Sequence, residues 1–280
     1  MPDVKQLPHL ISLLDDASLR DTILRQLAAF GPSLEDELRR AGLRLTAEQA
    51  RFIRPLLDVM YSAWIKAHWQ TWRAHPSDNA QLEAALDLIV LFQFGRLSPK
   101  RLSQSLDDLA DEFDARYTDR DPLSLAEFLF QGYALRGVAQ EDYYNPLNSN
   151  LLYVIEHRLG IPISLACVYI LVGDRLGLRI AGCNFPGHFL AIASTRREQV
   201  IIDCFNGGTR IGQNSLAAIG AQISEENILQ LKCGANVIVP RVLRNLSNAY
   251  EQANEHENAA TMAELLIQTE QSSEHSRPRN

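Results

Sequence analysis

The stretch of sequence that decides the fold reads Gly160-Ile-Pro-Ile-Ser-Leu-Ala-Cys167 and stays apolar as far as Gly173. Pro162 suits the first turn of a helix, and the spacing predicts a helix that ends near Leu176, just before a glycine. From Ile163 to Gly173 every side of this helix is apolar except at Ser164, and a helix that is apolar all round is a buried one. We therefore expect it to be the central helix of a domain.

A shorter helix is expected just before it, over Leu151–Leu159. Asn148 or Ser149 can cap its N-terminus, and Gly160 comes after its last residue, where helices often end. The two helices are therefore predicted to be joined by a very short connection.

Three β segments are expected after the buried helix, at about Leu178–Asn184, His188–Ala193 and Gln199–Cys204. The polar run Ser194-Thr-Arg-Arg-Glu198 predicts a hairpin between the last two. If Ser194 pairs with Gln199, His188 and Asp203 are diagonal neighbours on one sheet face, about 7–8 Å apart at Cα. A histidine oriented by an aspartate supplies the base and the acid of a nucleophile–base–acid triad. The pattern therefore predicts that His188 and Asp203 form a functional pair.

Four motifs lie around this pair: Tyr144-Asn-Pro-x-Asn-Ser-x-Leu, Glu156-x-Arg-x-Gly-Ile-Pro-Ile-Ser-Leu, Arg175-Leu-Gly-Leu and Asn184-Phe-Pro-Gly-His-Phe-Leu. Between about Leu86 and Leu266 the chain resembles the bacterial SirB-type proteins, within the transglutaminase-like branch of the papain-type cysteine enzymes. The resemblance implies an α+β transglutaminase-like domain with a buried central helix, an antiparallel sheet and a short TPR-like segment behind it. It also matches His188 and Asp203 to the catalytic His and Asp of that branch.

The chain departs from the active enzymes at the nucleophile. Those enzymes have Cys at the helix start, about four residues before a small residue that matches Ala166, but this region reads Ile161-Pro-Ile-Ser164. Ser164 and Cys167 are the candidate replacements. The ordinary interpretation of Ser164 is a capping or first-turn residue, and that of Cys167 is an inert, packed thiol among apolar neighbours.

Five further polar residues of the motif region are candidate binding residues: Asn148, Glu156, Arg158, Asn184 and Asn206. Glu156 and Arg158 can equally be a solvated surface pair, which contributes little to stability. The four cysteines form no CxxC pair and no zinc-type spacing with histidine, so no metal or cofactor is expected.

The overall charge limits the classes of molecule that the protein is expected to bind. With 27 basic and 34 acidic residues the net charge is −7, which argues against a nucleic-acid or anionic-membrane surface. The N-terminal residues lack the basic and apolar segments of a signal peptide, and the apolar runs are shorter than the roughly 20 residues of a membrane span. Unpatterned cysteines without an export signal predict a cytoplasmic protein.

The rest of the chain is expected to be helical, in three domains. Residues 1–78 contain a helix pair that resembles one HEAT repeat and must pack on the next part of the chain, because a single repeat cannot bury its own face. Further helices are expected at Leu34–Ala41, Thr46–Arg73, Gln81–Phe94, Pro99–Arg116 and Leu123–Ala134, and short ones at Ser215–Ile219 and Glu225–Gln230. Residues 79–236 form the transglutaminase-like domain, and residues 237–280 form a TPR-like helical hairpin with a polar tail.

The sequence favours a scaffold that lacks the usual catalytic Cys and binds a protein or peptide partner through the old cleft and its helical repeats. The alternative is a working hydrolase or acyltransferase with Cys167 or Ser164 as nucleophile, His188 as general base and Asp203 as orienting residue. A third possibility is a structural adaptor that uses only its helical surfaces.

Overall fold

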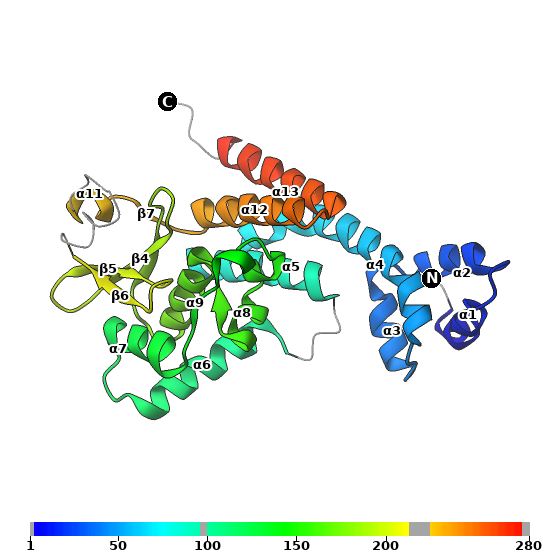
Figure 1. Cartoon of the computed structure of the whole chain (residues 1–280), viewed down its shortest axis with the longest axis horizontal. Coiled ribbons are helices and arrows are strands. Elements are labelled where there is room, and N and C mark those ends of the chain that lie inside the picture. The colour runs from blue at the N-terminus through cyan, green and yellow to red at the C-terminus, as the bar shows by residue number, and fades with distance from the viewer. Residues whose placement is uncertain (1–2, 96–99, 213–224, 276–280) are drawn as a thin grey trace. The chain divides into compact units, whose positions relative to one another are not determined.

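The computed structural model describes residues 3–95, 100–212 and 225–275 (Figure 1). The chain forms two compact units: an N-terminal unit of Met1–Trp69 with Leu91–Pro99, and a main unit of Gln70–Val90 with Lys100–Asn280. The α+β class expected from the sequence is confirmed, since the chain is mostly helical and carries an antiparallel sheet.

The described part of the N-terminal unit contains α1 (Leu7–Leu13), α2 (Arg20–Ala28), α3 (Leu34–Arg40) and α4 (Ala47–His68). Thr46 caps α4 as expected, because its hydroxyl accepts from Gln49 N while the Gln49 side chain accepts from Thr46 N. The Gln49 amide also donates to Ile11 O (3.2 Å) and to the Asp15 carboxylate (3.1 Å). The start of α4 is therefore bonded to the end of α1. Helix α4 is continuous through Pro55, which lies inside it.

The main unit contains α5 (Asp78–Phe94, whose last turn belongs to the N-terminal unit), α6 (Leu102–Arg116), α7 (Pro122–Glu127), α8 (Leu151–His157), α9 (Pro162–Arg175), α11 (Glu225–Leu229), α12 (Ala235–Gln252) and α13 (His256–His275). Its strands are β1 (Arg136–Gly137), β2 (Leu159–Gly160), β3 (Ile180–Cys183), β4 (Leu190–Ser194), β5 (Gln199–Asp203), β6 (Thr209–Ile211) and β7 (Lys232–Cys233). The short helix expected at Ser215–Ile219 lies outside the described residues.

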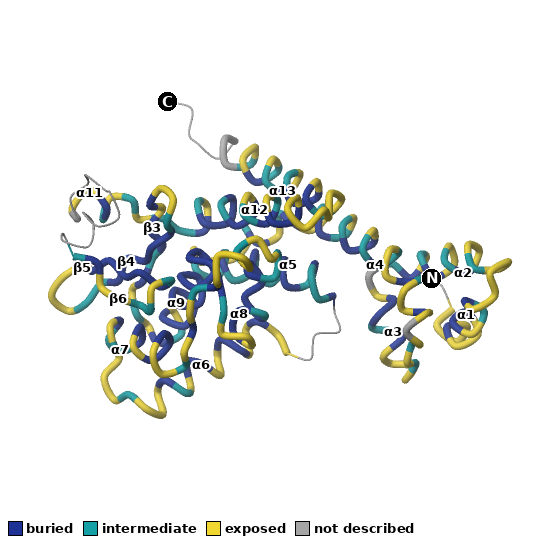
Figure 2. Tube along the Cα trace, in the orientation of Figure 1, coloured by how far each residue is buried: buried dark blue, intermediate teal, exposed yellow. Residues whose placement is uncertain are grey.

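Helix α9 is the central helix that the sequence predicts. Its residues from Pro162 to Gly173 are all buried, and the burial view colours buried residues dark blue (Figure 2). It packs against α6, α7 and α8 and against strands β3 and β4. It ends at Arg175 with Leu176 as its C-cap, close to the expected end, and Gly177 adopts the left-handed conformation (φ 71°) that favours glycine.

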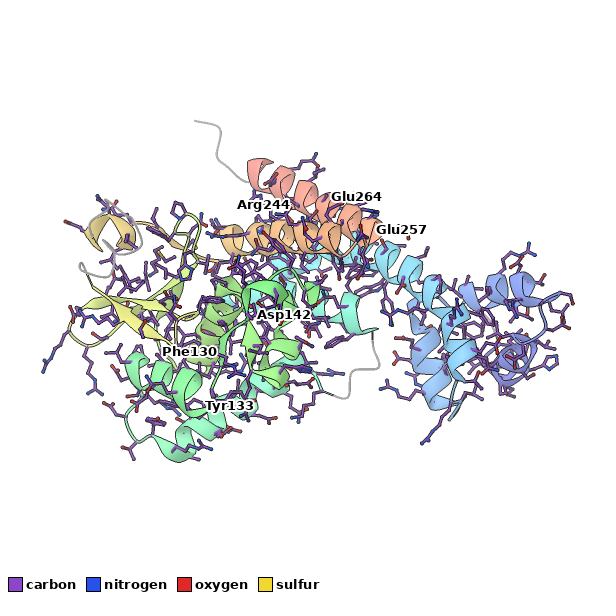
Figure 3. All side chains as sticks on the ribbon, viewed as in Figure 1. Phe130, Tyr133, Asp142, Arg244, Glu257 and Glu264 are labelled. Carbon is purple, nitrogen blue, oxygen red and sulfur yellow. The ribbon has the colours of Figure 1, made fainter. Side chains whose placement is uncertain are left out.

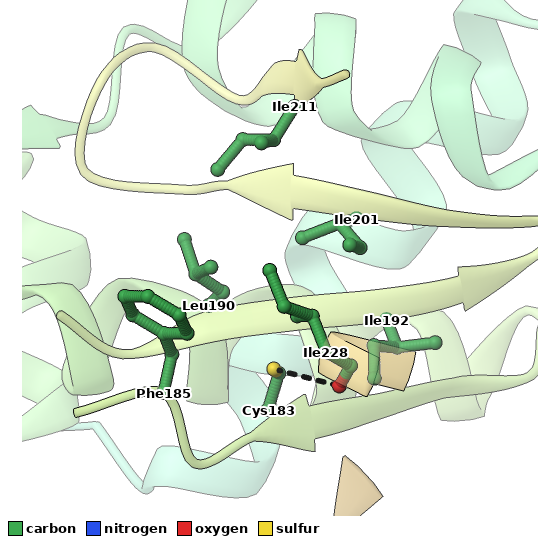
Figure 4. Packing of buried hydrophobic residues seen from close by; sticks show 7 residues of the cluster. All are labelled: Cys183, Phe185, Leu190, Ile192, Ile201, Ile211 and Ile228. Carbon is green, nitrogen blue, oxygen red and sulfur yellow. Dashed lines mark hydrogen bonds between the residues drawn. The ribbon is translucent and has the colours of Figure 1, made fainter. Parts of the chain in front are cut away.

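The main sheet has the strand order β6-β5-β4-β3-β7 and is antiparallel throughout. The predicted register of the β4–β5 hairpin is confirmed, because Ser194 pairs with Gln199. One sheet face is covered by α11, whose Ile228 completes an apolar cluster (Figure 4). That cluster contains Cys183, Phe185, Leu190, Ile192, Ile201, Ile211 and Ile228.

Several predicted boundaries were wrong for local reasons. Asn150, and not Asn148 or Ser149, caps α8 by accepting from Tyr153 N (3.2 Å). The helix ends two residues early because Arg158 takes the left-handed conformation (φ 58°). Gly160 is then free to pair with Gly137 in the small parallel β1–β2 ladder.

Two further helix boundaries also differ from expectation. The helix predicted over Leu123–Ala134 ends as α7 at Glu127 and continues as a single π-type turn over Phe128–Gly132. Helix α12 begins at Ala235, two residues before the hairpin boundary expected at residue 237, and Pro240 lies inside it.

The early start of α12 has a long-range cause. Both carboxylate oxygens of Asp78, at the start of α5, lie 3.1 Å from Ala235 N and accept its hydrogen bond. A carboxylate at a helix N-terminus satisfies a free N–H group and interacts favourably with the helix dipole. A Cβ on Gly234 would lie 1.8 Å from Asp78 Oδ2, so only glycine allows this approach.

Helices α12 and α13 lie side by side as a hairpin (Figure 1). The turn between them includes Asn254, which adopts the left-handed conformation (φ 59°). The helical hairpin expected at the C-terminal end is therefore present.

Arg175, from the Arg-Leu-Gly-Leu motif, fastens the end of α9 to two other helices. Its guanidinium bonds both carboxylate oxygens of Glu83 on α5 (2.9 Å each) and Asp107 on α6 (2.5 Å). Only 17% of its side chain is exposed. Charge-assisted bonds of this geometry contribute more than exposed ion pairs do.

We predict that Arg175→Met lowers the free energy of unfolding by about 2–3 kcal/mol, because two carboxylates lose their shared partner. The exposed pair Arg116–Glu112 on α6 supplies the control, and Arg116→Met is expected to cost about 0.5 kcal/mol or less. Urea denaturation of both variants measures the difference. Equal losses in the two variants would contradict the role given to Arg175.

Candidate functional site

His188 and Asp203 form the hydrogen bond that the predicted register implies. His188 Nε2 lies 2.9 Å from Asp203 Oδ1, just before the start of β4 and at the end of β5. About 24% of the His188 side chain is exposed, against 9% for Asp203. The imidazole is thus accessible from solvent while the carboxylate lies behind it, and His188 Nδ1 is the ring nitrogen left to meet a ligand.

Asp203 is held by more than the histidine. Its Oδ1 also accepts from the backbone N–H groups of Phe205 and Asn206 (both 3.1 Å), and its Oδ2 accepts from the Asn206 side chain (2.8 Å). Burial raises the pKa of Asp203, but the bonds from His188 and Asn206 outweigh burial and hold this pKa below its ordinary value of 3.8. The carboxylate is therefore ionised at neutral pH and fixes the histidine ring.

Phe205 connects the pair to the region where α9 begins. Its ring meets the His188 ring edge to face, with centroids 6.0 Å apart. A Cβ on Gly137 would lie 2.5 Å from the same ring, so the glycine of β1 leaves room for Phe205. Because β1 pairs with β2, which leads directly into α9, the pair stands near that end of the fold. Phe130, from the turn after α7 (labelled in Figure 3), approaches Gly208 closely, since a Cβ on that glycine would lie 2.3 Å from the Phe130 ring.

Ser164 is occupied by its own helix. Its hydroxyl donates to Ile161 O and accepts from Ile161 N, each at 3.0 Å, and the residue is only 2% exposed. Both functions of the hydroxyl therefore serve the start of α9, which is the capping interpretation of this residue.

Cys167 is fully buried in α9, with no exposed surface. Burial raises the pKa of this thiol far above its ordinary value of 9.0, and the nearby Cys233 raises it further. His188 is not among the groups that shift the pKa of Cys167. A nucleophilic cysteine needs the opposite surroundings, with partial exposure and a lowered pKa.

The five candidate binding residues fall into different environments. Asn206 belongs to the His188–Asp203 site through its bond to the carboxylate. Asn148 is buried and donates to Asp142 O (2.7 Å) and Tyr143 O (3.2 Å), so it braces the motif loop from inside.

The other three candidates point to solvent. Asn184 is exposed and accepts a hydrogen bond from Arg241 of α12 (2.5 Å). Glu156 and Arg158 are exposed, and Arg158 stacks on the Tyr133 ring (4.6 Å). In the described part of the chain, no hydrogen bond or ion pair joins Glu156 or Arg158 to the His188–Asp203 pair.

Comparison with known protein families assigns the domain to a superfamily. Residues 100–244 match the family model described as the Transglutaminase-like superfamily. The chain belongs to this superfamily.

Individual relatives of this transglutaminase-like chain are similar at moderate identity. A UPF0162 protein of Xylella fastidiosa is 36% identical over 157 residues, which cover 52% of this chain and 56% of the relative. A UPF0162 protein of Pseudomonas aeruginosa is 28% identical over 202 residues, 68% of this chain and 72% of the relative. F-box only protein 21 of Mus musculus is 34% identical over 110 residues, 33% of this chain and 18% of the relative.

The chain thus spans little more than half the length of the Xylella relatives it matches. No solved structure matches.

Sequence reasoning missed the contribution of α12 to the motif region of the transglutaminase-like domain. Asn245 and Asn248 of α12 line a small recess of about 30 Å³ together with Tyr143, Tyr144, Asn145, Ser149, Ile161 and Ala249. The recess therefore joins the first motif, the residue that precedes α9, and α12. The signal in the sequence is the spacing of Arg241, Asn245 and Asn248, which puts three polar residues on one helix face.

A larger recess lies within the N-terminal unit and has a different character. It measures about 410 Å³ and is lined by Glu35, Leu38, Arg39, Gly42, Leu43, Arg44, Leu45 and Leu57. This lining offers neither a Ser, Cys nor His side chain, so it carries none of the chemistry that the motifs suggest.

The described segments contain neither a metal-binding cluster nor a membrane-spanning helix. No group of three or more His, Cys, Asp or Glu side chains there could hold a metal ion. No helix of those segments is long and apolar enough to cross a membrane.

The lowered pKa of Asp203 predicts a pH-dependent stability. The ionised carboxylate stabilises the fold above its unfolded pKa, near 3.8, and this stabilisation is lost as the pH falls through the lower, folded-state pKa. Asp203→Asn should therefore lower the free energy of unfolding by about 1–3 kcal/mol at pH 7, and the gap to wild type should narrow below about pH 4. Urea titrations across this range measure the gap, with the exposed Asp119→Asn as control. A gap independent of pH would show that an ionised Asp203 does not stabilise the fold.

The burial of Cys167 predicts a slow thiol. Iodoacetamide at neutral pH should alkylate Cys167 slowly in the folded protein, because the pKa of this thiol is raised and its surface is closed. His188→Ala should change that rate little. Peptide mass spectrometry over time measures it, with the urea-unfolded chain as the fast reference. Rapid alkylation that drops sharply in His188→Ala would reveal a coupled thiol–imidazole pair.

Proposed function

We propose that this transglutaminase-like chain is a protein-binding scaffold without the catalytic cysteine of the active enzymes. The observation that carries the proposal is the state of the two candidate nucleophiles. Cys167 is fully buried, and the hydroxyl of Ser164 is hydrogen-bonded in both directions to Ile161. A site that keeps its base and orienting acid but offers no free nucleophile is suited to binding more than to acyl transfer.

The proposed binding surface is centred on the loops that carry the motifs. The first motif contributes Tyr144, which is 54% exposed. The last motif contributes the loop from Asn184 to His188. Exposed aromatic side chains beside amides and a histidine are common in protein–protein contacts. The net charge of −7 favours a protein or peptide partner over nucleic acid or an anionic membrane.

We also propose the finer family assignment and domain division. The resemblance of the motifs of residues 144–190 supports membership of the SirB-type proteins, with a HEAT-like extension over residues 1–78, the transglutaminase-like core over 79–236 and a TPR-like hairpin over 237–280. The α1–α2 and α12–α13 helix pairs support the two repeat-like ends. The lack of patterned cysteines supports a cytoplasmic location.

A cysteine or serine hydrolase or acyltransferase is the second candidate. The observation in its favour is the hydrogen bond between His188 and Asp203, which would orient the imidazole as a general base. In that case Cys167 or Ser164 would have to become exposed before it could act as nucleophile.

Selection of phage-displayed random 12-mer peptides on the full chain tests the proposal. We expect peptides whose binding, followed by fluorescence anisotropy, is weakened at least about tenfold by Tyr144→Ala. Leu123→Ala, at a partly exposed position of α7 (37%), should leave binding unchanged. Mass spectrometry should recover the peptides intact after prolonged incubation.

Two outcomes would count against the scaffold. Selection of no peptide would reject the binding function. Peptide cleavage or acyl transfer that disappears in His188→Ala would establish the hydrolase or acyltransferase in its place.

A further inference from the structure

Arg241 occupies an unusual position at the edge of the motif region. Its Nη1 donates to Asn184 Oδ1 (2.5 Å) and to Phe185 O (3.1 Å), and its guanidinium lies over the Phe189 ring (5.1 Å). Two residues of the loop that ends at His188, and the residue just after it, thus fix the cation. The guanidinium is preorganised, so little side-chain entropy remains to be lost when it binds a ligand.

This fixed cation lacks a carboxylate partner in the described part of the chain, although the chain as a whole is acidic. Arg175, Arg244 and Arg196 each pair with an aspartate or glutamate. Both bonds of Arg241 use Nη1, so the edge formed by Nε and Nη2 has no acceptor among the described residues. That edge presents two parallel N–H groups, the arrangement that binds a carboxylate with two hydrogen bonds.

Arg241 lies on the same face of α12 as two residues that line the small recess beside Tyr143 and Tyr144. Arg241, Asn245 and Asn248 are spaced by four and three residues on α12, so their side chains share one face of the helix. We call this set of three residues the Arg241 face. Asn245 and Asn248 line the recess of about 30 Å³, which has room for one small polar group such as a peptide carbonyl. A half-buried cation thus stands about one turn of helix from a site lined by amides and phenols.

We propose that the Arg241 face is a subsite for a carboxylate of the bound peptide, with its amides holding the adjoining peptide backbone. This inference rests on the proposed protein-binding function and defines the chemistry of its ligand. The carboxylate comes from an Asp or Glu side chain or from the C-terminus of the partner.

The charge around Arg241 favours a carboxylate over a phosphate. Phosphate groups carry close to two negative charges and are usually held by clusters of arginine. The nearby Arg244, labelled on the C-terminal hairpin in Figure 3, is already paired with Glu270 (2.5 Å). One unpaired guanidinium therefore matches one singly charged carboxylate.

Two peptide libraries distinguish the sources of the carboxylate. One displays random 12-mers fused at their C-termini, so that only side-chain carboxylates are available, and the other displays 12-mers with free C-termini. Acidic side chains enriched at one position in the first library would assign the subsite to Asp or Glu. Enrichment confined to the second library would assign it to a C-terminal carboxylate.

The role of Arg241 is then measured with the selected peptide and with a matched uncharged peptide. In the uncharged peptide the acidic residue is replaced by its amide, as in Glu→Gln, or the C-terminus is amidated. Wild type should prefer the charged peptide by about tenfold or more in anisotropy titrations, as expected for a charge-assisted bidentate contact. Arg241→Gln should abolish this preference. Arg244→Gln, on the same helix, should retain it.

Arg241 also holds the Asn184 loop, so Arg241→Gln removes both its positive charge and its loop contacts. A third variant separates the effect of the lost charge from that of the disturbed loop. Arg241→Lys loses the fork but keeps the cation, and it should retain part of the preference for the charged peptide. Peptides selected without an acidic group, or a preference that survives in Arg241→Gln, would overturn the carboxylate subsite alone. Equal loss in Arg241→Gln, Arg241→Lys and Arg244→Gln would also overturn it. Selection of no peptide from either library would overturn both this inference and the proposed function.

Discussion

The burial of α9 is the constraint on which the rest of the domain depends. A helix with no polar face must be covered on all sides, because each exposed apolar side chain would cost about 1.5–3 kcal/mol of burial free energy. The covering layers are helices α6, α7 and α8 together with strands β3 and β4. Ser164, the polar residue near its start, satisfies its hydroxyl within the first turn. The same burial removes Cys167 from solvent, so the feature that organises the core also suppresses the chemistry of its thiol.

The His188–Asp203 pair serves structure and possible function at once. Asp203 accepts four hydrogen bonds, three of them from the two residues that come after Cys204 and one from His188. This arrangement orders the turn after the strand and keeps the carboxylate charged despite its burial. A binding scaffold can therefore retain the pair for the stability of the loop, and its presence does not require catalysis.

Long-range polar contacts made by α12 connect distant parts of the main unit. Asp78, which stands at the start of α5, caps α12 from 157 residues away, and Arg241 fixes the Asn184 loop from 57 residues away. Buried or half-buried polar contacts of this kind are stronger than exposed ones because the local dielectric constant is lower. The C-terminal hairpin is in this way part of the motif region and not only an appendage.

The sequence by itself determined the buried helix, the hairpin register and the His188–Asp203 contact, because each depends on local periodicity: apolar residues on all sides of one helix, and a polar turn between two apolar strands. It also indicated that Ser164 is a capping residue. Only the tertiary structure decided where α12 begins, since its cap is supplied by Asp78 of another helix. The same holds for β6 and β7, which are too short to show a period and form by pairing with longer strands. The environment of Arg241 was likewise decided in three dimensions, because its partners come from a distant loop. That it has no carboxylate partner among the described residues also cannot be seen along the chain.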